Sequence, residues 1–233
     1  MYDLLHEFIF YVQKKHRMYG YETDYRILAD KLDIAVSYHP YNTALTYKAF
    51  FPIITINYNQ SVERVRFCGM HEIAHVMLSD CGIEESIVNH FGGDELDAEP
   101  YIEKFCNVAA SHLLIPHPVV HVALDRWDYT PMAILEMARL SRADLQTALK
   151  RMVHLQETAS VAGMLCSGRT VLDLSKHNFR LPIRRYEVLP SNHPAFNAAS
   201  GHNTRIEMDG NIDLLVTRIQ NTQKIVGLYV GTW

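Results

Sequence analysis

The sequence predicts an α+β protein in which a helical core with a small β-sheet is followed by a helical region and a β-rich tail. Three observations predict this fold class. Apolar residues recur at helical spacing through most of the first 160 residues. Two short β-branched runs interrupt that spacing before residue 60. Beyond residue 160 the pattern changes to short β-like runs separated by turn residues.

Composition agrees with a folded, water-soluble chain and excludes several classes. The 233 residues are 48% hydrophobic and 21% charged, which argues against disorder, and no apolar run is long enough to span a membrane. A net charge of −4 gives no global sign of nucleic-acid binding. Asp3, His6 and Glu7 interrupt the first apolar segment, so a secretory signal is not expected. We therefore expect a cytoplasmic protein with no membrane partner.

Cysteine usage fits the same compartment. Four cysteines in a chain of this length do not form a disulfide framework, and none of them makes a CxxC pair. We expect all four to be reduced. Histidine is the outlier, with 13 residues, and it directs attention to metal-ligand spacing.

The first 114 residues are expected to form four helices, with two strands between the second and the third. Leu4, Leu5 and Phe8 open an amphipathic segment, and Ser61 is a candidate N-cap for a later helix. Residues 80–99 form an acidic stretch that we expect to be a loop. The expected elements are helices at 3–17 and 24–32, strands at 34–38 and 51–58, and helices at 61–79 and 97–114.

The last third of the chain divides into a helical and a β-rich part. Pro116 and Pro118 are expected to end the core helices. Two consecutive helices are then expected at 131–140 and 141–155. Short strands are expected at 161–166, 170–174, 184–189, 204–208, 212–219 and 224–230.

The informative motif is His71-Glu72-Ile73-Ala74-His75, an HExxH. Positions i and i+4 share one face of a helix, so the two imidazoles can converge on a single ion. Glu72 lies one residue round, where it can hold a water and accept its proton during attack on an amide carbonyl. Apolar neighbours indicate a largely buried helix, where two imidazoles and a carboxylate need partners. Those neighbours are Val65, Phe67, Ile73, Ala74, Val76, Met77 and Leu78.

A catalytic zinc needs a third protein ligand, for which Asp97, Glu99, Glu103 and His112 are candidates. Glu103 is the choice, because it lies in a core-facing stretch of helix and Asn107 follows one turn later to orient a ligand. Glu99 lies nearer the acidic stretch, and His112 is about half a turn round from Glu103. Two histidines and one glutamate suit Zn²⁺, although Mn²⁺ or another divalent ion can occupy such a site.

Two segments resemble the ImmA/IrrE-type metallo-endopeptidases. They are RFCGMHEIAHVML at 66–78 and EKFCNVAASHLLIP at 103–116, and the likeness extends over roughly residues 24–155. The resemblance implies a zincin-like core and a zinc-dependent endopeptidase that cleaves a helix-turn-helix transcriptional repressor. Stress response or control of mobile elements is the implied setting. The implied site has His71, His75 and Glu103 as metal ligands, in a gluzincin-like set, and Glu72 as the catalytic base.

The sequence departs from the family pattern at two places. Phe105-Cys106-Asn107 stands where relatives commonly have Glu-Ala-Asn, so only Glu103 is available as the acidic ligand. Cys68 stands where a threonine is usual. It is either a small buried side chain or a redox-sensitive neighbour of the metal that can become a fourth ligand.

Three domains are expected: a zinc metallopeptidase core at 1–125, a helix-turn-helix-like region at 126–158 and a β-rich domain at 159–233. The resemblance allows a GAF-like sensor for the third, although some 75 residues are short for one. The helical region carries only a modest basic excess. It is therefore either a module for packing or substrate docking, or a weak DNA contact.

The basic run, the second strand and the oxyanion donor each have more than one interpretation. The run Lys176, Arg180, Arg184 and Arg185 is either a solvated loop or a docking site for a DNA-bound repressor or another anion. The strand at 52–58 is either an ordinary sheet strand or an edge that binds the substrate backbone. The donor that stabilises the oxyanion stays open between Tyr47, Tyr58, Tyr101, His112, His117 and His121.

Two other functions remain as alternatives to the endopeptidase. The first is a DNA-binding or sensor regulator with a structural zinc site, which needs a fourth ligand such as Cys68 or Cys106 and does not need Glu72. The second is an aminopeptidase or another hydrolase with the same zinc chemistry.

Overall fold

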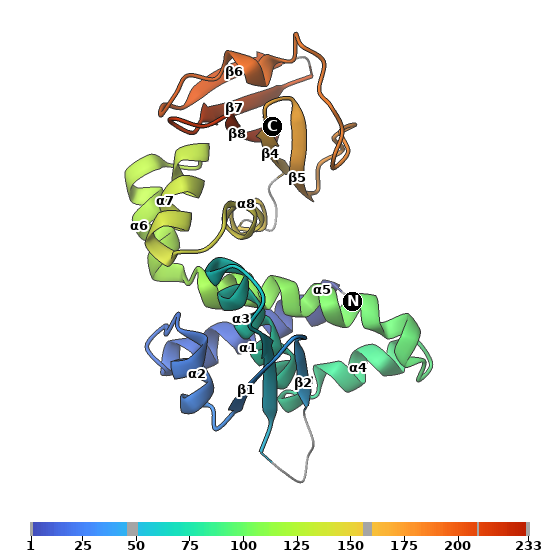
Figure 1. The fold of residues 1–233 in the computed structure, drawn as a ribbon. Coiled ribbons are helices and arrows are strands. Elements are labelled where there is room, and N and C mark those ends of the chain that lie inside the picture. The colour runs from blue at the N-terminus through green and yellow to red at the C-terminus, as the bar shows by residue number, and fades with distance from the viewer. Residues whose placement is uncertain (1, 46–50, 156–159, 209, 232–233) are drawn as a thin grey trace. The chain divides into compact units, whose positions relative to one another are not determined.

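A computed structural model describes residues 2–45, 51–155, 160–208 and 210–231 of the chain (Figure 1). The chain divides into two compact units, residues 1–117 and 118–233. Helices dominate the first unit and a β-sheet dominates the second, so the predicted α+β class with a helical core and a C-terminal sheet is confirmed. The expected domain boundaries after residues 125 and 158 stay predictions.

The first unit combines helices with a three-stranded sheet. The strand order is β1-β3-β2, in which β3 pairs parallel with β1 and antiparallel with β2. In Figure 1 the helix α3 lies behind this sheet, and α5 runs alongside α3. The elements are α1 (Tyr2–Met18), α2 (Tyr25–Lys31), β1 (Ala35–His39), β2 (Thr43–Leu45), β3 (Ile53–Asn57), α3 (Val62–Asp80), α4 (Ile83–His90) and α5 (Glu95–Leu114).

The strand expected at 51–58 exists, but its interpretation as an edge is wrong. β3 lies in the centre of the sheet and pairs on both sides, so its backbone is not available to a substrate. The two edge strands of this sheet are β1 and β2. The sequence did not reveal β2. A strand of three residues carries too little alternation to be recognised.

Packing between α1, α3 and α5 builds the core of the first unit. Phe8 and Phe105 stack with ring centroids 6.4 Å apart, and both are buried. Ser61 caps α3 as expected, because its side chain accepts a hydrogen bond from the backbone N–H of Arg64. This core fixes α3 and α5 beside each other, and these helices carry the candidate site.

The acidic stretch at 80–99 is a helix and a short turn rather than a loop. α4 begins after Gly82, whose φ of +74° suits glycine, and buries Ile83 and Ile87 one turn apart. Asp94 then caps α5, which begins two residues before the expected position. Only two buried positions mark α4, which explains why its periodicity was too weak to predict it.

The second unit begins with α6 (His117–Trp127), which the sequence analysis did not assign. Pro118 is expected to end a helix, but it occupies the first turn of α6. Backbone N–H groups in the first turn have no acceptor within the helix, so a proline there removes no hydrogen bond. The helices α7 (Pro131–Ser141) and α8 (Leu145–Val153) follow close to their expected positions.

A five-stranded antiparallel sheet forms the rest of the second unit, in the order β5-β4-β8-β7-β6 (Figure 1). The strand expected at 184–189 is absent from the described segment, which contributes only an isolated bridge between Thr170 and Val188. The elements are β4 (Val161–Ser167), β5 (Thr170–His177), the 3₁₀ helix η1 (Pro194–Asn197), β6 (Thr204–Met208), β7 (Ile212–Arg218) and β8 (Lys224–Gly231).

The helix α8 packs on this sheet. Leu149 and Val153 lie so close to Gly163 of β4 that a Cβ there would be 2.6–2.7 Å from them. Six of the nine residues of α8 are buried, so little of the helix faces solvent. This packing favours the structural interpretation of the helical region over DNA contact through α8.

All four cysteines are free. Within the described residues, no helix is long and apolar enough to cross a membrane.

Candidate metal centre

Helix α3 presents the HExxH motif as the sequence predicts. His71 and His75 are one turn apart on α3, and their Nε2 atoms approach to 3.0 Å. Their rings meet edge to face with centroids 4.7 Å apart. Both side chains are mostly buried, with 12% and 18% of their surface exposed. The helix therefore directs two imidazole nitrogens at one point.

Glu103 approaches the same point from α5. Its carboxylate oxygens lie 3.3 Å from Nε2 of His71 and 3.2 Å from Nε2 of His75. Among the described residues, these three form the one group of histidine, cysteine and acidic side chains whose ligand atoms all lie within 4.8 Å. The structure thus brings together the three residues that the sequence analysis selected.

The geometry fits a tetrahedral ion. Ligand atoms about 2.0–2.1 Å from a tetrahedral zinc are separated from each other by roughly 3.3 Å. The three separations between His71, His75 and Glu103 are 3.0, 3.3 and 3.2 Å. Three such donors leave one tetrahedral position for water or substrate.

The charge state of His71 supports metal binding over a simple ion pair. Burial, with the neighbouring charges of His75 and Arg64, lowers the pKa of His71 to about 4. The imidazole is then neutral near pH 7, so its approach to Glu103 is not explained by opposite charges. Nδ1 of His71 is buried and has no hydrogen-bond partner among the described residues.

Glu72 lies between the two histidines in sequence and is 5% exposed. No described side chain or backbone group donates a hydrogen bond to its carboxylate. Burial, and then the charge of Glu103, raise its pKa to about 7. A buried carboxylate with its pKa near neutrality is suited to exchange protons.

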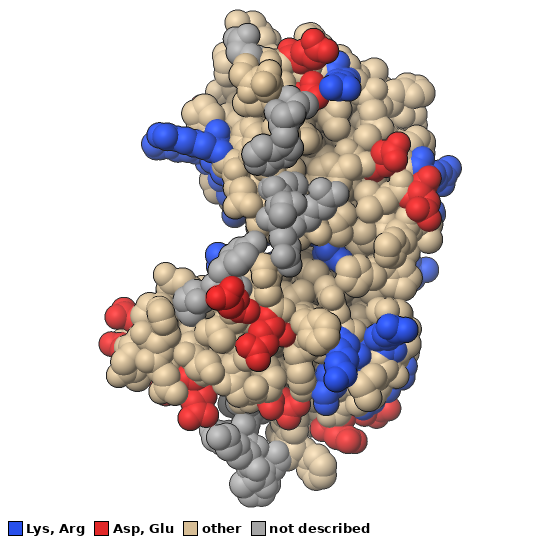
Figure 2. Space-filling view, turned by 180° about the vertical axis from the view of Figure 1, so that it is seen from behind, with Lys and Arg blue, Asp and Glu red and all other residues tan. Residues whose placement is uncertain are grey.

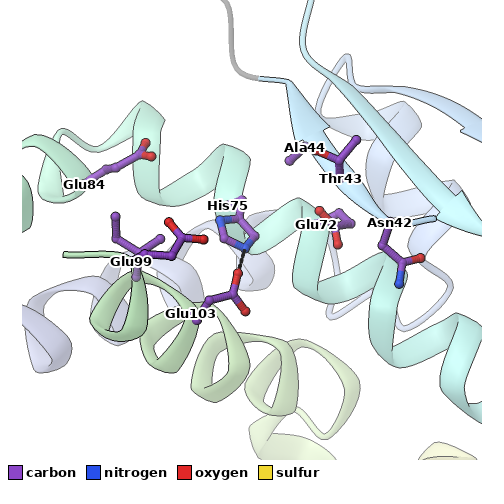
Figure 3. A pocket seen from close by; sticks show the side chains of 9 residues that line it. Asn42, Thr43, Ala44, Glu72, His75, Glu84, Glu99 and Glu103 are labelled. Atoms are coloured by element: carbon purple, nitrogen blue, oxygen red, sulfur yellow. Dashed lines mark ion pairs between the residues drawn. The ribbon is translucent and has the colours of Figure 1, made fainter. Parts of the chain in front are cut away.

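A cavity of about 340 Å³ opens beside these residues. In Figure 3, Glu84 and Glu99 lie on one side of His75, whereas Glu72 and Asn42 lie on the other. The walls come from α3, α4, α5, edge strand β2 and the residue before it. The lining residues are Asn42, Thr43, Ala44, Glu72, His75, Glu84, Glu99, Ile102 and Glu103.

The other candidates for the third ligand fall outside the cluster. Glu99 lines the cavity but does not join the three converging donors. Asp97 is exposed in the first turn of α5. His112 pairs through Nδ1 with the amide of Gln13 at 2.9 Å. Asn107 donates to the backbone carbonyl of Glu103 at 2.7 Å, so it stabilises the helix and does not touch the carboxylate.

Cys68 is held by two amide side chains. Its thiol donates to Oε1 of Gln60 and accepts from Nδ2 of Asn42, at 3.3 and 3.4 Å. Burial raises its pKa, which disfavours the thiolate form that a metal ligand requires. Neither Cys68 nor Cys106 belongs to the converging group. This environment supports a small, buried, protonated side chain.

None of the described candidates for the oxyanion donor lines the cavity of the metal centre. Tyr47 lies outside the described residues. The other five candidates, Tyr58, Tyr101, His112, His117 and His121, are absent from the lining of the cavity.

Glu99 is exposed to solvent, as the sequence analysis expected, and it also lines the cavity. Sequence reasoning missed three polar lining residues, Asn42, Thr43 and Glu84. These residues come from β2, the segment before it, and α4, the elements that were not predicted. Asn42 also accepts a hydrogen bond from the backbone N–H of Asn57 at 2.6 Å, which ties its segment to the end of β3. No local sequence signal identifies them, because they meet the site only after folding.

Comparison with known proteins identifies the class of protein that carries this cluster as a peptidase family. Residues 29–152, more than half of the chain, match the peptidase family described as the IrrE N-terminal-like domain. The chain belongs to this family, which confirms the resemblance seen in the sequence.

Two curated relatives are radiation response metalloproteases named IrrE, from Deinococcus radiodurans and Deinococcus deserti. They are 37% and 36% identical to the chain over 98 residues, which is 42% of the chain. The match covers 29% and 34% of those proteins, so the matched region spans about a third of their length.

A solved structure shares the fold. It is titled "Mycobacterium tuberculosis transcriptional regulator" and superposes with a TM-score of 0.63, covering 97% of this chain and 76% of that one. The sequences are 14% identical, so the likeness concerns the fold alone.

Proposed function

We propose that the chain is a zinc-dependent endopeptidase that cleaves a helix-turn-helix transcriptional repressor in the cytoplasm and thereby relieves repression. The carrying observation is the convergence of His71, His75 and Glu103 beside the buried carboxylate of Glu72. Membership of the peptidase family and the metalloprotease relatives support the proposal.

His71, His75 and Glu103 would hold the ion. A bound zinc would polarise the scissile carbonyl and lower the pKa of the attacking water. Glu72 would accept the proton of that water and deliver it to the leaving amine, which is why a carboxylate close to the ligands matters. Zn²⁺ is the proposed ion, and Mn²⁺ can occupy the same donors.

The edge of the small sheet would bind the substrate. Thr43 and Ala44 of β2 line the cavity beside Glu72, and among the described residues β2 pairs with β3 alone. An extended substrate segment can add to such an edge through generic amide hydrogen bonds. This mode would present an internal peptide bond to the site and suits an endopeptidase within a zincin-like core.

The remaining domains have weaker proposals. A sensor role of GAF type for residues 159–233 stays a prediction. On the face drawn in Figure 2, acidic and basic side chains are interspersed without a continuous basic band, so this face gives no support for DNA contact. In the basic run, Lys176 donates to the carbonyls of Leu181 and Ile183, and Arg185 donates to that of Leu172. These two cations therefore organise their own loop.

A regulator with a structural zinc site is the competing proposal. It requires a fourth protein ligand, and among the described residues only three converge. The environment of Cys68 also disfavours its recruitment. The peptidase is therefore the better supported function.

Glu72→Gln separates the two proposals. The zinc-loaded wild type and variant are incubated with helix-turn-helix repressors of the source organism, and mass spectrometry identifies fragments. We expect wild-type cleavage of an internal bond, with a loss of at least about a hundredfold in the variant because general-base catalysis is removed. Zinc content should be unchanged. Zinc binding with no cleavage by wild type would favour the regulator, and removal of terminal residues alone would favour an aminopeptidase.

A further inference from the structure

We propose that Glu84 and Glu99 form a subsite that selects a lysine or arginine side chain of the substrate beside the scissile bond. This inference rests on the proposed peptidase function and names its substrate class. The two residues are called the acidic subsite below.

The acidic subsite lies in the cavity of the metal centre but outside the donor cluster. Glu84 comes from α4 and Glu99 from α5, one turn before Glu103. Figure 3 shows both carboxylates on the side of His75 that faces away from Glu72. A substrate that extends along β2 and past Glu72 would bring a neighbouring side chain toward them.

The acidic subsite is not neutralised within the protein. Neither Glu84 nor Glu99 pairs through its side chain with a described cation. With Glu72 and Glu103, they place four carboxylates around one cavity of about 340 Å³. The pKa of the nearby thiol of Cys106 is raised well above its usual value. Burial is the largest cause, and the charges of these four residues raise the pKa further. A bound zinc would balance part of this charge and leave the side away from it negative.

The buried carboxylate of Glu72 is a second, independent observation that points to a ligand in this cavity. Glu72 is 95% buried, has no hydrogen-bond donor among the described residues, and is aimed into the cavity. Leaving a buried carboxylate without a partner costs free energy, which an incoming polar ligand recovers. On the same wall, β2 has no partner beyond β3 among the described residues, and such an edge suits an extended peptide as the ligand.

The geometry favours a long organic cation over a second metal ion. Three ligand atoms must come within a few ångströms of each other to hold an ion. Among the described residues, His71, His75 and Glu103 are the only group that does so, and neither Glu84 nor Glu99 belongs to it. Spaced carboxylates instead suit a guanidinium or ammonium group on a flexible stem, which reaches them by charge-assisted hydrogen bonds.

The test uses the zinc-loaded full chain and a mixture of unstructured synthetic peptides, with mass spectrometry to locate the cut bonds. Arginine and lysine should be enriched at one fixed position beside the cut. A matched peptide pair then replaces that arginine by citrulline, which has the same shape without the charge. We expect kcat/KM to be about tenfold higher for the arginine peptide.

Substitutions assign the selectivity to the acidic subsite. The double variant Glu84→Gln with Glu99→Gln should reduce the arginine-to-citrulline ratio of kcat/KM to nearly one, because the charges that distinguish the two peptides are removed. Glu85→Gln is the control, because Glu85 is the next residue on α4 and does not line the cavity. Binding of both peptides to the zinc-loaded Glu72→Gln protein, measured by fluorescence anisotropy, provides a readout that needs no cleavage.

The outcomes separate this inference from the proposed function. Cleavage without a charge preference, or a preference that survives the double variant, overturns the acidic subsite and leaves the peptidase intact. Arginine-selective binding that depends on Glu84 and Glu99 but without cleavage by wild type supports the acidic subsite and overturns the peptidase. Absence of both cleavage and selective binding overturns both.

Discussion

A neutral imidazole distinguishes this histidine cluster from an ordinary ion pair. Burial keeps His71 uncharged near pH 7, and its Nε2 lies about as far from His75 and Glu103 as tetrahedral ligands lie from each other. A cation held between these side chains would accept a lone pair from each Nε2 atom and from the carboxylate of Glu103. The residue environment therefore favours metal binding.

Glu103→Ala should abolish stable zinc binding. The acidic ligand is lost, and since substitutions that merely disturb the groups around a ligand cost about 10–100-fold in affinity, we expect a loss greater than about a hundredfold. Elemental analysis and competition with a chelator measure it. Glu99→Ala is the control, because it removes the same charge from the same cavity one turn away. Tight binding in Glu103→Ala together with loss in Glu99→Ala would show that the ligand is Glu99.

His16 should make stability depend on pH. It is buried, and its Nε2 bonds to the carbonyl of Glu22 at 2.7 Å, which requires the ring to donate a proton there. Burial lowers its pKa below 6.5 in the folded protein, so between the two values the unfolded chain binds more protons. The contribution of His16 to stability is therefore retained above pH 6.5 and lost as the pH falls below it.

Urea unfolding between about pH 7.5 and about pH 5.5 measures this dependence. His16→Gln is the matched variant, because glutamine can donate to the same carbonyl without titrating. The fall in unfolding free energy below pH 6.5 should be smaller in the variant than in wild type. An equal fall in both proteins would assign the dependence to other groups.

At the scale of elements, the site depends on how closely α3 packs against its neighbours. Gly69 lies two residues before His71, and a Cβ there would lie 2.3 Å from the ring of Tyr25 on α2. Tyr25 is buried and its hydroxyl bonds to that of Tyr38 on β1 at 3.2 Å, so the ring has little room to move. The absence of a side chain at Gly69 thus allows α2 to pack against α3, the helix that carries His71 and His75.

Gly69→Ala should lower the free energy of unfolding by about 1–3 kcal/mol through overpacking, although alanine favours helix formation. Chemical denaturation measures the loss, and zinc titration shows whether α3 is displaced. The double variant with Tyr25→Ala should be destabilised by less than the sum of the single changes, because the clash is absent. Additive losses would mean that another contact is responsible.

Two elements show where sequence patterns fail. The pattern at 117–127 contains Pro118, a residue type that can end one helix or begin the next, and its position in the first turn of α6 decides between these roles. The pattern at 184–189 is β-like, yet this segment lacks continuous ladder partners. Local propensity therefore predicts α3, α5, α7 and most strands of the C-terminal sheet, whereas short or weakly periodic elements depend on their neighbours.

At the scale of the whole molecule, each unit has its own core. The candidate metal centre and its cavity lie within residues 1–117. The C-terminal sheet encloses a separate cluster that includes Met164, Leu214 and Tyr229. A ligand that binds one unit is then expected to stabilise that unit alone.

Calorimetry of the full chain tests this separation. Added zinc should raise the temperature of one unfolding transition and leave the other unchanged. Gly163→Ala should lower the other transition, because its Cβ would overlap with Leu149 and Val153 of α8. The zinc content of this variant should equal that of wild type. A single transition that both changes shift would show that the units unfold together.

The sequence by itself determined the fold class, the buried helix with its HExxH and the choice of Glu103. These features follow from periodicity and spacing within one or two helices, where geometry is local. Only the tertiary structure decided that β2 rather than β3 is the free edge, and that Glu84 and Glu99 share a cavity with Glu72. The physical reason is that edges and cavities arise from contacts between segments distant in sequence, and no local pattern records which segments will meet.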